Sequence, residues 1–499
     1  MWRMEKVIYC RLLKRSGVGL ALFISVGVAA FAQGSLGTTM GQQPLATASE
    51  GGASGPSDGK RSITSTSTVS DASKDQSLTY HGITIYGIID SGLSNQTNGA
   101  PYNSDAPQTG VENSIGPNGR ESITHLSDNG MSQSVIGIRG NVKLFEGLSF
   151  IFNLAPGIEP LSLRFTNSLQ SLVTNNGVSL QDQTTDYDTN RAGGIDNGDA
   201  YLGLKLKGYG ALTFGRQTSL IVDSAVKYDP NPGSYNFSLI GYIGNYVGGG
   251  DSEDDRLNSS IKYANQIGPF RLGALGQFKG HNAVFSRYGV YGSTSQLDLG
   301  ADYRHLSADF TYSRRYDGIS AASLSAAQML TAPATSLAAT ISDNTAYNVM
   351  GKDTVGRHAT VYGGYGHIRY ANPGTPLTPG ITTIGGYELS VLNQTVYTNN
   401  KILQVYWTGL KYSLTPKLDL TGSYYGWRQN SYSGNGCSNN SSSKCSGNRN
   451  NASFDAVYKL TKHLDAYGGL MWSDVTNGLS AGYLATNSVS TIFGGRFTF

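Results

Sequence analysis

The chain has 499 residues, of which only 14% are charged, while glycine (65 residues) and tyrosine (31 residues) are abundant. Beyond positions 1–32, no window approaches the ~20 consecutive apolar residues of a spanning helix, which excludes a helical membrane protein. The formal net charge is +3, and it falls to 3 − 4 = −1 without the five basic residues and one acidic residue of positions 1–32. We therefore expect no nucleic-acid partner.

The N-terminus has the features of a secretory signal peptide. Basic residues are followed by an apolar region, 18–31, and the small residues of Ala30-Phe31-Ala32 fit a cleavage site. The alternative, a short membrane anchor, is disfavoured because the apolar run is too short to span a bilayer. Positions 33–76 are rich in Ser, Thr and Gly without periodicity, which predicts a disordered tether. The sequence thus divides into a signal peptide (1–32), a tether (33–76) and a folded domain (77–499).

The first strand signal starts at Ile83. Ile83, Ile85 and Ile89 alternate with Thr84, Tyr86 and Asp90, which is the period of two that a strand with one apolar face requires. Similar alternation follows at about 132–142 and 147–157, and again in the hairpin 199–217, whose turn contains Gly208 and Gly210. The last such segment is 490–499, in which Phe493, Phe497 and Phe499 share one face.

Short and long connections alternate between these strands. Short turns are predicted near 145–147, 207–210, 266–269, 304–307, 352–357, 414–417 and 460–463. Long loops are predicted at 158–196, 218–257, 280–295, 317–342, 371–400, 431–450 and 475–488. Seven hairpins and one strand at each end give sixteen strands. Short turns on one side and long loops on the other are typical of an outer-membrane barrel, because only a helix or a closed barrel satisfies every backbone hydrogen bond in lipid.

The fold class predicted is therefore all-β, a 16-stranded antiparallel transmembrane β-barrel. A soluble β-sandwich or propeller is the alternative, and it does not explain why the long loops fall only on alternate connections. Some of the strand aromatics should form interfacial girdles. The candidates for these girdles are Tyr362, Tyr365, Tyr406, Trp407, Tyr412, Tyr424, Tyr425, Trp427, Tyr467 and Trp472.

The loop that follows the 199–217 hairpin is about forty residues long and closes on an acidic run. Loops of this length in a compact architecture are usually functional, and we expect this one to fold into the barrel and narrow its bore. It offers the carboxylates Asp223, Asp229, Asp251, Glu253, Asp254 and Asp255. Strand parity places other charged and aromatic side chains on the lumen wall: Tyr86, Asp90, Arg139, Asp199, Tyr201, Lys205, Arg271, Asp298, Asp302, Arg304 and Arg496.

Several of these segments together resemble the general bacterial porins of Gram-negative outer membranes, of the neisserial and burkholderial type. The resemblance covers residues from about 80 to 499, and the order and spacing of the segments are more specific than any one of them. The matching pieces are Thr84-Ile-Tyr-Gly-Ile-Ile-Asp90, Gly137-Ile-Arg-Gly140, Ala200-Tyr-Leu-Gly203, Gly215-Arg-Gln217, Arg256-Leu-Asn-Ser259 with Tyr263, and the terminal Phe499.

The resemblance implies a homotrimer in the Gram-negative outer membrane, in contact with its lipid and lipopolysaccharide, that passes ions and small hydrophilic solutes by diffusion. It also implies that the third outside loop bends into the lumen. Arg216 breaks the alternation of its strand, and the family match suggests that a bulge at Gly215 turns it inward. The hypothesis is that wall arginines (Arg139, Arg216 and Arg271) face the loop carboxylates and create a transverse field. For each charge, the alternative is a solvated position at a barrel mouth.

Two other functions remain open at this point. An outer-membrane enzyme needs a nucleophile–His pair or an Asp–His pair, and no motif frames any of the histidines. A channel specific for sugars or carboxylates would use aromatics such as Tyr235, Phe237, Tyr242 and Tyr246, which alternatively pack the loop against the wall. We expect no cofactor or metal. Cys437 and Cys445 are expected to form a disulfide in an oxidising compartment.

Overall fold

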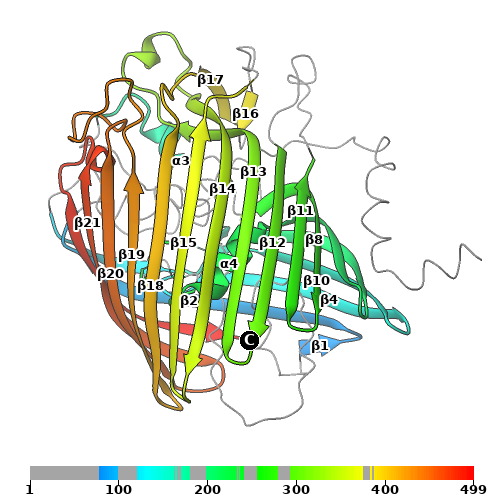
Figure 1. Ribbon diagram of the computed structural model, residues 1–499. Coiled ribbons are helices and arrows are strands. Elements are labelled where there is room, and N and C mark those ends of the chain that lie inside the picture. Colours follow the sequence, from blue (N-terminus) through cyan, green and yellow to red (C-terminus); the bar gives the residue numbers. More distant parts are fainter. Residues whose placement is uncertain are drawn as a thin grey trace, which may run out of the picture. The chain divides into compact units, whose positions relative to one another are not determined.

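The computed structural model describes residues 78–98, 121–161, 163–165, 170–179, 198–232, 234, 236–240, 256–278, 293–374, 382–384 and 387–499. Its main sheet has 20 strands, of which 16 form a ring and four (β1, β3, β16 and β17) are short additions. Each ring strand pairs antiparallel with its sequence neighbour in the ring. The ring closes where β22 pairs with β2, with Arg496 opposite Asp90. The prediction of a 16-stranded antiparallel barrel is therefore confirmed. Figure 1 shows the arrangement of these strands.

The ring strands have the following bounds: β2 Ile83–Gln96, β4 Val135–Phe145, β5 Leu148–Pro156, β8 Gly198–Leu206, β9 Gly210–Thr218, β10 Arg256–Ile267, β11 Phe270–Gln277, β12 Ser293–Tyr303, β13 Leu306–Ala322, β14 Leu337–Val355, β15 Ala359–Ala371, β18 Lys401–Thr415, β19 Leu418–Gln429, β20 Gly447–Lys459, β21 Leu464–Asn477 and β22 Asn487–Thr498. The smaller elements are β1 Thr79–Tyr80, β3 Ile123–Asp128, β6 Ile158–Glu159, β7 Arg164–Phe165, β16 Thr382–Ile384, β17 Tyr387–Asn393, α3 Gln170–Thr174, α4 Leu220–Tyr228, η5 Gln328–Leu330 and η6 Gly478–Ser480.

Side-chain alternation explains why these segments form a barrel with two different faces. In β8, Leu202, Leu204 and Leu206 are exposed on the outer face, while Asp199 and Tyr201 are buried on the inner face. The same division holds in β2 and β22. A broad exposed apolar band is a liability in water, but it is the stable surface of a barrel embedded in lipid. Among the described residues, no helix has the length and hydropathy that crossing a membrane requires.

All seven predicted short turns lie between ring strands that pair with each other. Three predicted long loops are shorter than expected. The loop expected at 317–342 shrinks because β13 and β14 stay paired as far as Ala322 and Ala338. Beyond a bulge near Arg315, these extensions bury Ile319, Leu337 and Ile341 in a small apolar cluster. The loops expected at 431–450 and 475–488 are likewise shortened by longer β20, β21 and β22.

The aromatic residues divide between the two faces. Tyr365, Tyr412 and Trp472 are exposed on the outer face, where an interfacial girdle requires them. Four of the candidates are instead buried on the inner face and are not girdle residues: Trp407, Tyr425, Trp427 and Tyr467. The indole of Trp407 covers Gly364, its cross-strand partner in β15, where a larger side chain would collide with the ring.

Candidate functional site

The lumen contains a segment, residues 219–240, that follows β9 and begins with α4. The Ser219 hydroxyl accepts a hydrogen bond from the Val222 amide at 3.2 Å and caps the helix. Asp223 lies in the first turn and Lys227 in the last, as the helix dipole favours. The helix ends at Asp229, because the residue before a proline is disfavoured in helical conformation. Figure 1 shows α4 among the ring strands.

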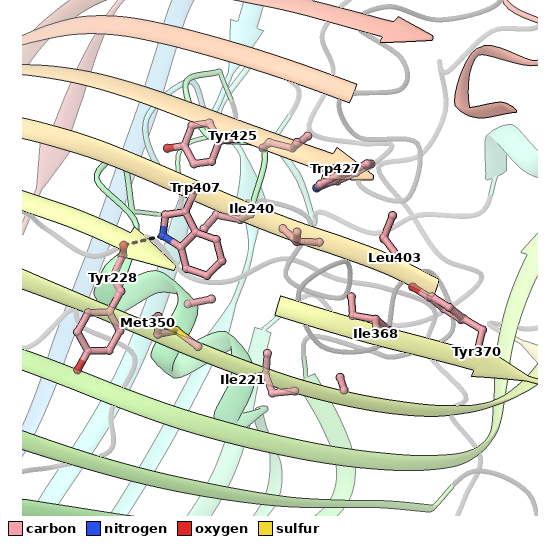
Figure 2. Packing of buried hydrophobic residues seen from close by; sticks show 14 of the residues in the cluster. Ile221, Tyr228, Ile240, Met350, Ile368, Tyr370, Leu403, Trp407, Tyr425 and Trp427 are labelled. Carbon is pink, nitrogen blue, oxygen red and sulfur yellow. Dashed lines mark hydrogen bonds between the residues drawn. The ribbon is translucent and has the colours of Figure 1, made fainter. Parts of the chain in front are cut away.

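One face of this segment packs against the inner wall. Ile221, Tyr228 and Ile240 are buried in a single cluster with inward residues of five strands. The wall residues of the cluster are Ala346, Met350, Ile368, Tyr370, Leu403, Val405, Trp407, Tyr425, Trp427 and Met471. Figure 2 shows the indole of Trp407 pointing at the main chain of Tyr228, to whose carbonyl oxygen its N–H donates at 2.9 Å. This cluster explains why the inward aromatics are not part of a lipid girdle.

A buried carboxylate fixes the second half of the segment. Asp229 accepts hydrogen bonds from the Ser238 hydroxyl at 2.6 Å, the Tyr425 hydroxyl at 2.7 Å and the Asn231 amide at 3.0 Å. Burial raises the pKa of Asp229 to about 6, against the opposing effect of these three hydrogen bonds. The segment is thus tied to β19 by a group that titrates between its ordinary range and neutrality.

The segment then reaches the wall of β20 to β22. The Ser453 hydroxyl donates to the Phe237 carbonyl oxygen at 2.7 Å, and the Phe237 ring is buried beside Tyr467 and Ile492. The Asn236 amide and the Ser234 hydroxyl both donate to the Gly130 carbonyl oxygen. Phe237 therefore packs the segment against the wall, and Tyr235, Tyr242 and Tyr246 lie outside the described residues.

The helix carries charges that pair with the wall. Asp223 forms an ion pair with Lys262 of β10 and accepts a hydrogen bond from the Thr218 hydroxyl at 2.6 Å. Lys227 lies 3.5 Å from Asp309 of β13. Burial lowers the pKa of Lys227 to about 8, and the neighbouring Asp309 carboxylate opposes that change. Both charges of α4 are partly exposed, so the helix also has a polar side.

Arg271 lies next to this contact, on the inner face. It forms ion pairs with Asp302 and Asp309 and donates to the Tyr228 hydroxyl at 3.0 Å. Asp298 accepts a hydrogen bond from the Ser224 hydroxyl of α4 at 3.1 Å. Arg304, in contrast, lies exposed in the turn between β12 and β13 with a positive φ of 55°, so its assignment to the lumen wall is wrong.

Arg139 and Tyr86 lie in a second polar network. The Arg139 guanidinium lies over the Tyr86 ring at 5.0 Å, and the Tyr86 hydroxyl donates to Asn153 at 2.7 Å. Asn153 in turn donates to Asp199 at 3.3 Å, and Asp199 forms a buried ion pair with Arg256 at 3.0 Å. The Asn153 contact satisfies the second carboxylate oxygen of this buried pair, which reduces the cost of burying the two charges.

Asp90 and Arg496 lie on the inner face, where both hold another internal segment, residues 129–134. Asp90 accepts hydrogen bonds from the Met131 and Ser132 amides at 3.0 and 2.8 Å and from the Tyr467 hydroxyl at 2.5 Å. Arg496 donates to the Ser132 hydroxyl at 2.9 Å and pairs with Asp465 at 2.8 Å. Their side chains are buried by this segment.

Arg216 lies at the loop end of β9, where it pairs with Ala200 on the face that also carries the exposed Phe214. Its guanidinium donates to the Gly198 carbonyl oxygen at 3.0 Å and to the Asn258 side chain at 2.7 Å. The register irregularity is in β10, between Leu257 and Ser260, not at Gly215. The register therefore gives no support to the inward turn expected for Arg216.

Lys262 is a lumen residue that sequence reasoning missed, and the bulge in β10 explains why. Strict alternation from Leu257 would put Ile261 inward and Lys262 outward. The bulge shifts the parity by one residue, so that Ser260 and Lys262 are buried on the inner face. The positive φ of Ser259 marks the position of the bulge.

The remaining predicted site residues are simpler to place. Asp251, Glu253, Asp254 and Asp255 lie outside the described residues. Cys437 and Cys445 form the expected disulfide. His305 contacts Asp353, but this Asp–His pair is exposed at the short-turn end of the barrel. No cluster of three or more His, Cys, Asp or Glu side chains suited to a metal ion occurs in the part of the chain that the structure describes.

Comparison with known proteins gives the identity of this barrel. A family model described as Gram-negative porin matches residues 62–478. An anion-selective porin from Comamonas acidovorans has a similar fold, with 15% identity, a TM-score of 0.54, and coverage of 84% of this chain and 99% of that one. OmpT of Vibrio cholerae, in a trimer form, has 13% identity and a TM-score of 0.51, with coverage of 84% and 99%.

A search among curated proteins found no match. The two solved structures support the fold, and the family model covers most of the chain, including 15 of the 16 ring strands, from β2 to β21. A porin is a channel rather than an enzyme. The chain belongs to the Gram-negative porin family, as an outer-membrane β-barrel channel for passive diffusion.

Proposed function

We propose that this porin is a general diffusion channel whose bore is set by the internal segment 219–240. The observation that carries the proposal is the attachment of this segment to the wall through Trp407 and Tyr425. Because the segment is held at the end of α4 and at Asp229, it reduces the cross-section of the pore permanently. A steric constriction with a polar lining is what size-selective diffusion needs.

We assign the electrostatic field across the constriction to the charges of Arg139 on the wall and of Asp223 and Lys227 on α4. The Arg139 guanidinium lies over the Tyr86 ring, and Asp223 and Lys227 are partly exposed on α4. Asp223 is paired with Lys262, so its charge is largely balanced. We expect Arg139 to favour anions in the opening. Arg271 contributes less, because two aspartates pair with it.

Liposome swelling with sugars of graded size tests the general-pore proposal. A smooth decline of the swelling rate with solute mass is expected, and one sugar that enters far faster than its size predicts would instead show a substrate-specific channel. The packing of Phe237 in the wall supports the general pore, because a buried ring is unavailable to a passing sugar. The assay also checks the role of the segment, since weakening its attachment should raise the exclusion limit.

The assembly and processing of the chain are part of the proposal. We propose that the protein is a homotrimer in contact with outer-membrane lipid and lipopolysaccharide, as porins of this type are, and the OmpT structure in its trimer form is consistent with that expectation. We also propose that residues 1–32 are removed as a signal peptide. Mass spectrometry of the protein from outer membranes tests the cleavage, because the mature chain should begin at Gln33.

A further inference from the structure

The second outside loop, which joins β5 to β8, leaves the barrel wall beside β4. Gly157 forms an isolated bridge with Val135. The Ile158 amide donates to the Ser134 carbonyl oxygen at 2.9 Å. β6 and β7 then form a small hairpin in which Phe165 lies opposite Ile158. At Phe165 the chain is therefore still next to the wall of β4 and β5.

Seven residues further on (172 − 165 = 7), the same loop contacts a distant part of the barrel. Leu172 and Val173 of α3 pack against the small apolar cluster that β13 and β14 bury in their extensions, together with Leu389 of β17. Leu389 pairs in parallel with Leu337 of β14, so this docking site is built from three strands. Figure 1 shows α3 at the loop end of the barrel. The loop thus begins on one wall and docks on another.

The length of the chain decides its route between these two places. Five ring strands, β8 to β12, separate β5 from β13. With a spacing of about 4.8 Å between neighbouring strands, the six spacings make an arc of at least about 29 Å along the rim. Seven residues of fully extended chain reach at most about 25 Å. The chain from Phe165 to Gly177, which we call the strap, therefore cannot follow the rim and crosses the outside opening.

One side chain, Asn176, fastens the far end of the strap. Its Nδ2 group donates to the carbonyl oxygens of Ala334 and Ser336, both at 2.7 Å. Its Oδ1 atom accepts from the Leu324 amide at 2.7 Å. The next amide in the chain, that of Gly177, donates to the Leu324 carbonyl oxygen at 2.8 Å. A carboxamide offers two donors and an acceptor, so Asn176 bonds to main-chain atoms on both sides of the loop between β13 and β14.

The receiving loop is itself held in place. The Ser336 hydroxyl donates to the Pro333 carbonyl oxygen and lies 2.6 Å from the Ser390 hydroxyl of β17. Gly177 has a positive φ of 71°, and a Cβ atom there would lie 3.1 Å from the Met329 side chain. Glycine is the residue that adopts this conformation without strain. The strap is therefore shaped to fit a preformed partner.

We propose that Asn176 fixes the strap across the opening of its own barrel, and that the strap is a second determinant of size selectivity. Small ions pass on either side of the strap. A solute whose width approaches half of the opening is admitted on one side only and in few orientations, so the strap slows its entry before it reaches the internal segment 219–240. The proposal rests on diffusion through the barrel and is independent of how the segment 219–240 sets the bore.

Asn176→Asp tests the strap in the full-length folded protein. The carboxylate still accepts from the Leu324 amide, but it loses both donors and places a charge against two carbonyl oxygens. Limited proteolysis should cut this variant between positions 160 and 180 faster than wild type, while the barrel keeps its heat-dependent mobility on gels. Liposome swelling with the largest sugar that enters should be about twofold faster relative to arabinose, because the whole opening becomes available.

The matched control is Asn439→Asp, which adds the same charge at the loop end of the barrel. Asn439 accepts from the Ser441 amide and hydroxyl through its Oδ1 atom, and an aspartate retains this acceptor. The control should match wild type in proteolysis and in swelling. Conductance in potassium chloride should be close to wild type in both variants. Release of the segment 219–240 raises that conductance, so failure of the strap is distinguishable from failure of the proposed constriction.

Cross-linking tests whether the strap docks within one chain. Val178 and Ser325 each follow a residue of the hydrogen-bonded pair Gly177 and Leu324. A short bismaleimide should therefore join Val178→Cys to Ser325→Cys within a single chain, and the denatured protein should run as a monomer. In an Asn176→Asp background, the cross-link should restore the swelling rate of the large sugar to that of wild type.

Three results would overturn the proposal. The first is proteolysis of Asn176→Asp at the wild-type rate, which would reject Asn176 as the fastening residue. The second is faster proteolysis with no change in the relative swelling rate of the large sugar, which would reject the role in selectivity. The third is a cross-link that joins two chains, because the strap would then cross to the barrel of a neighbouring copy.

Discussion

The indole N–H of Trp407 donates a hydrogen bond to the carbonyl oxygen of Tyr228 at 2.9 Å, although the two residues are 179 positions apart in the chain. Trp407 is on the wall strand β18, and Tyr228 is the last residue of α4 in the lumen. The contact therefore joins the part of the porin that spans the membrane to the part that narrows its bore. Its neighbours Ile221, Ile240 and Met350 exclude water from it.

Trp407→Phe should loosen the internal segment. The change keeps an aromatic ring over Gly364 but leaves the Tyr228 carbonyl without its donor, which costs about 1–3 kcal/mol for a buried group. Single-channel recordings should show more current noise and more frequent brief transitions than wild type. The matched control is Trp472→Phe, because Trp472 is on the outer face and 40% exposed. Equal noise in all three proteins would contradict the role of this hydrogen bond.

The attachment of the segment should strengthen at acid pH through Asp229. Its pKa in the folded protein is raised from the ordinary 3.8 to about 6, so the lodged segment binds a proton that the released segment does not. The attachment of the segment therefore becomes more stable as the pH falls through about 6. This contribution of the Asp229 proton is fully present below 3.8 and is lost as the pH rises above 6. Current noise should decrease between pH 7 and pH 4 in wild type.

Asp229→Asn provides the control for this pH dependence, because its amide oxygen can still accept from Tyr425 and the Asn231 amide, its NH2 group can donate to the Ser238 hydroxyl, and the side chain does not titrate in this range. The noise of this variant should be low and constant over the same interval. A variant that still responds to acid like wild type would exclude Asp229 as the responsible group.

Arg139→Ala should shift ion selectivity toward cations. Removing one positive charge near the opening changes the energy of a passing ion by about 1 kcal/mol at 4 Å in water, with opposite sign for cations and anions, so the cation-to-anion permeability ratio should rise by up to roughly thirtyfold. Reversal potentials in a salt gradient measure this ratio. Arg357→Ala removes a charge from the short turn at the barrel end and should leave it nearly unchanged, and Arg216→Ala, at the rim, should have a smaller effect than Arg139→Ala. Unchanged selectivity in Arg139→Ala would reject its placement at the constriction.

The disulfide should be fully formed in protein purified from the outer membrane. A thiol reagent should label no cysteine of the unreduced, denatured mature chain and two after reduction, Cys437 and Cys445. Closing so short a loop is worth about 2–3 kcal/mol in the chain-entropy model, so Cys437→Ser with Cys445→Ser should lower the resistance of the loop to protease while the barrel persists. Labelling of the unreduced chain would contradict the bond.

Most of the barrel is predictable from the sequence because alternation is a local property. The β8–β9 hairpin illustrates this, since four apolar residues on one face and the turn glycines fix its register without reference to the rest of the chain. The bulge at Ser259 is not visible in that pattern, and it moved Lys262 to the lumen against strict parity. Likewise, the local sequence pattern does not predict that β13 and β14 continue beyond the bulge near Arg315. That extension is stabilised by a cluster of residues that are distant in the sequence.

The internal contacts were the least predictable part of the site. β18 has large apolar side chains on both faces, with Val405 and Trp407 inside and Leu410 outside, so parity alone did not separate the lipid girdle from the wall that supports α4. Parity puts Asp90 and Arg496 on the inner face, but their binding to residues 129–134 depends on a loop whose position no periodicity specifies.

Single-channel conductance of the refolded protein in a planar bilayer tests the central claim most directly. The account predicts stepwise current increases with a linear current–voltage relation, and a larger conductance when the segment 219–240 is released by combining Trp407→Phe with Tyr425→Phe, which removes both wall donors. A protein that inserts but passes no current, or a double variant with the conductance and noise of wild type, would contradict a diffusion pore narrowed by this segment.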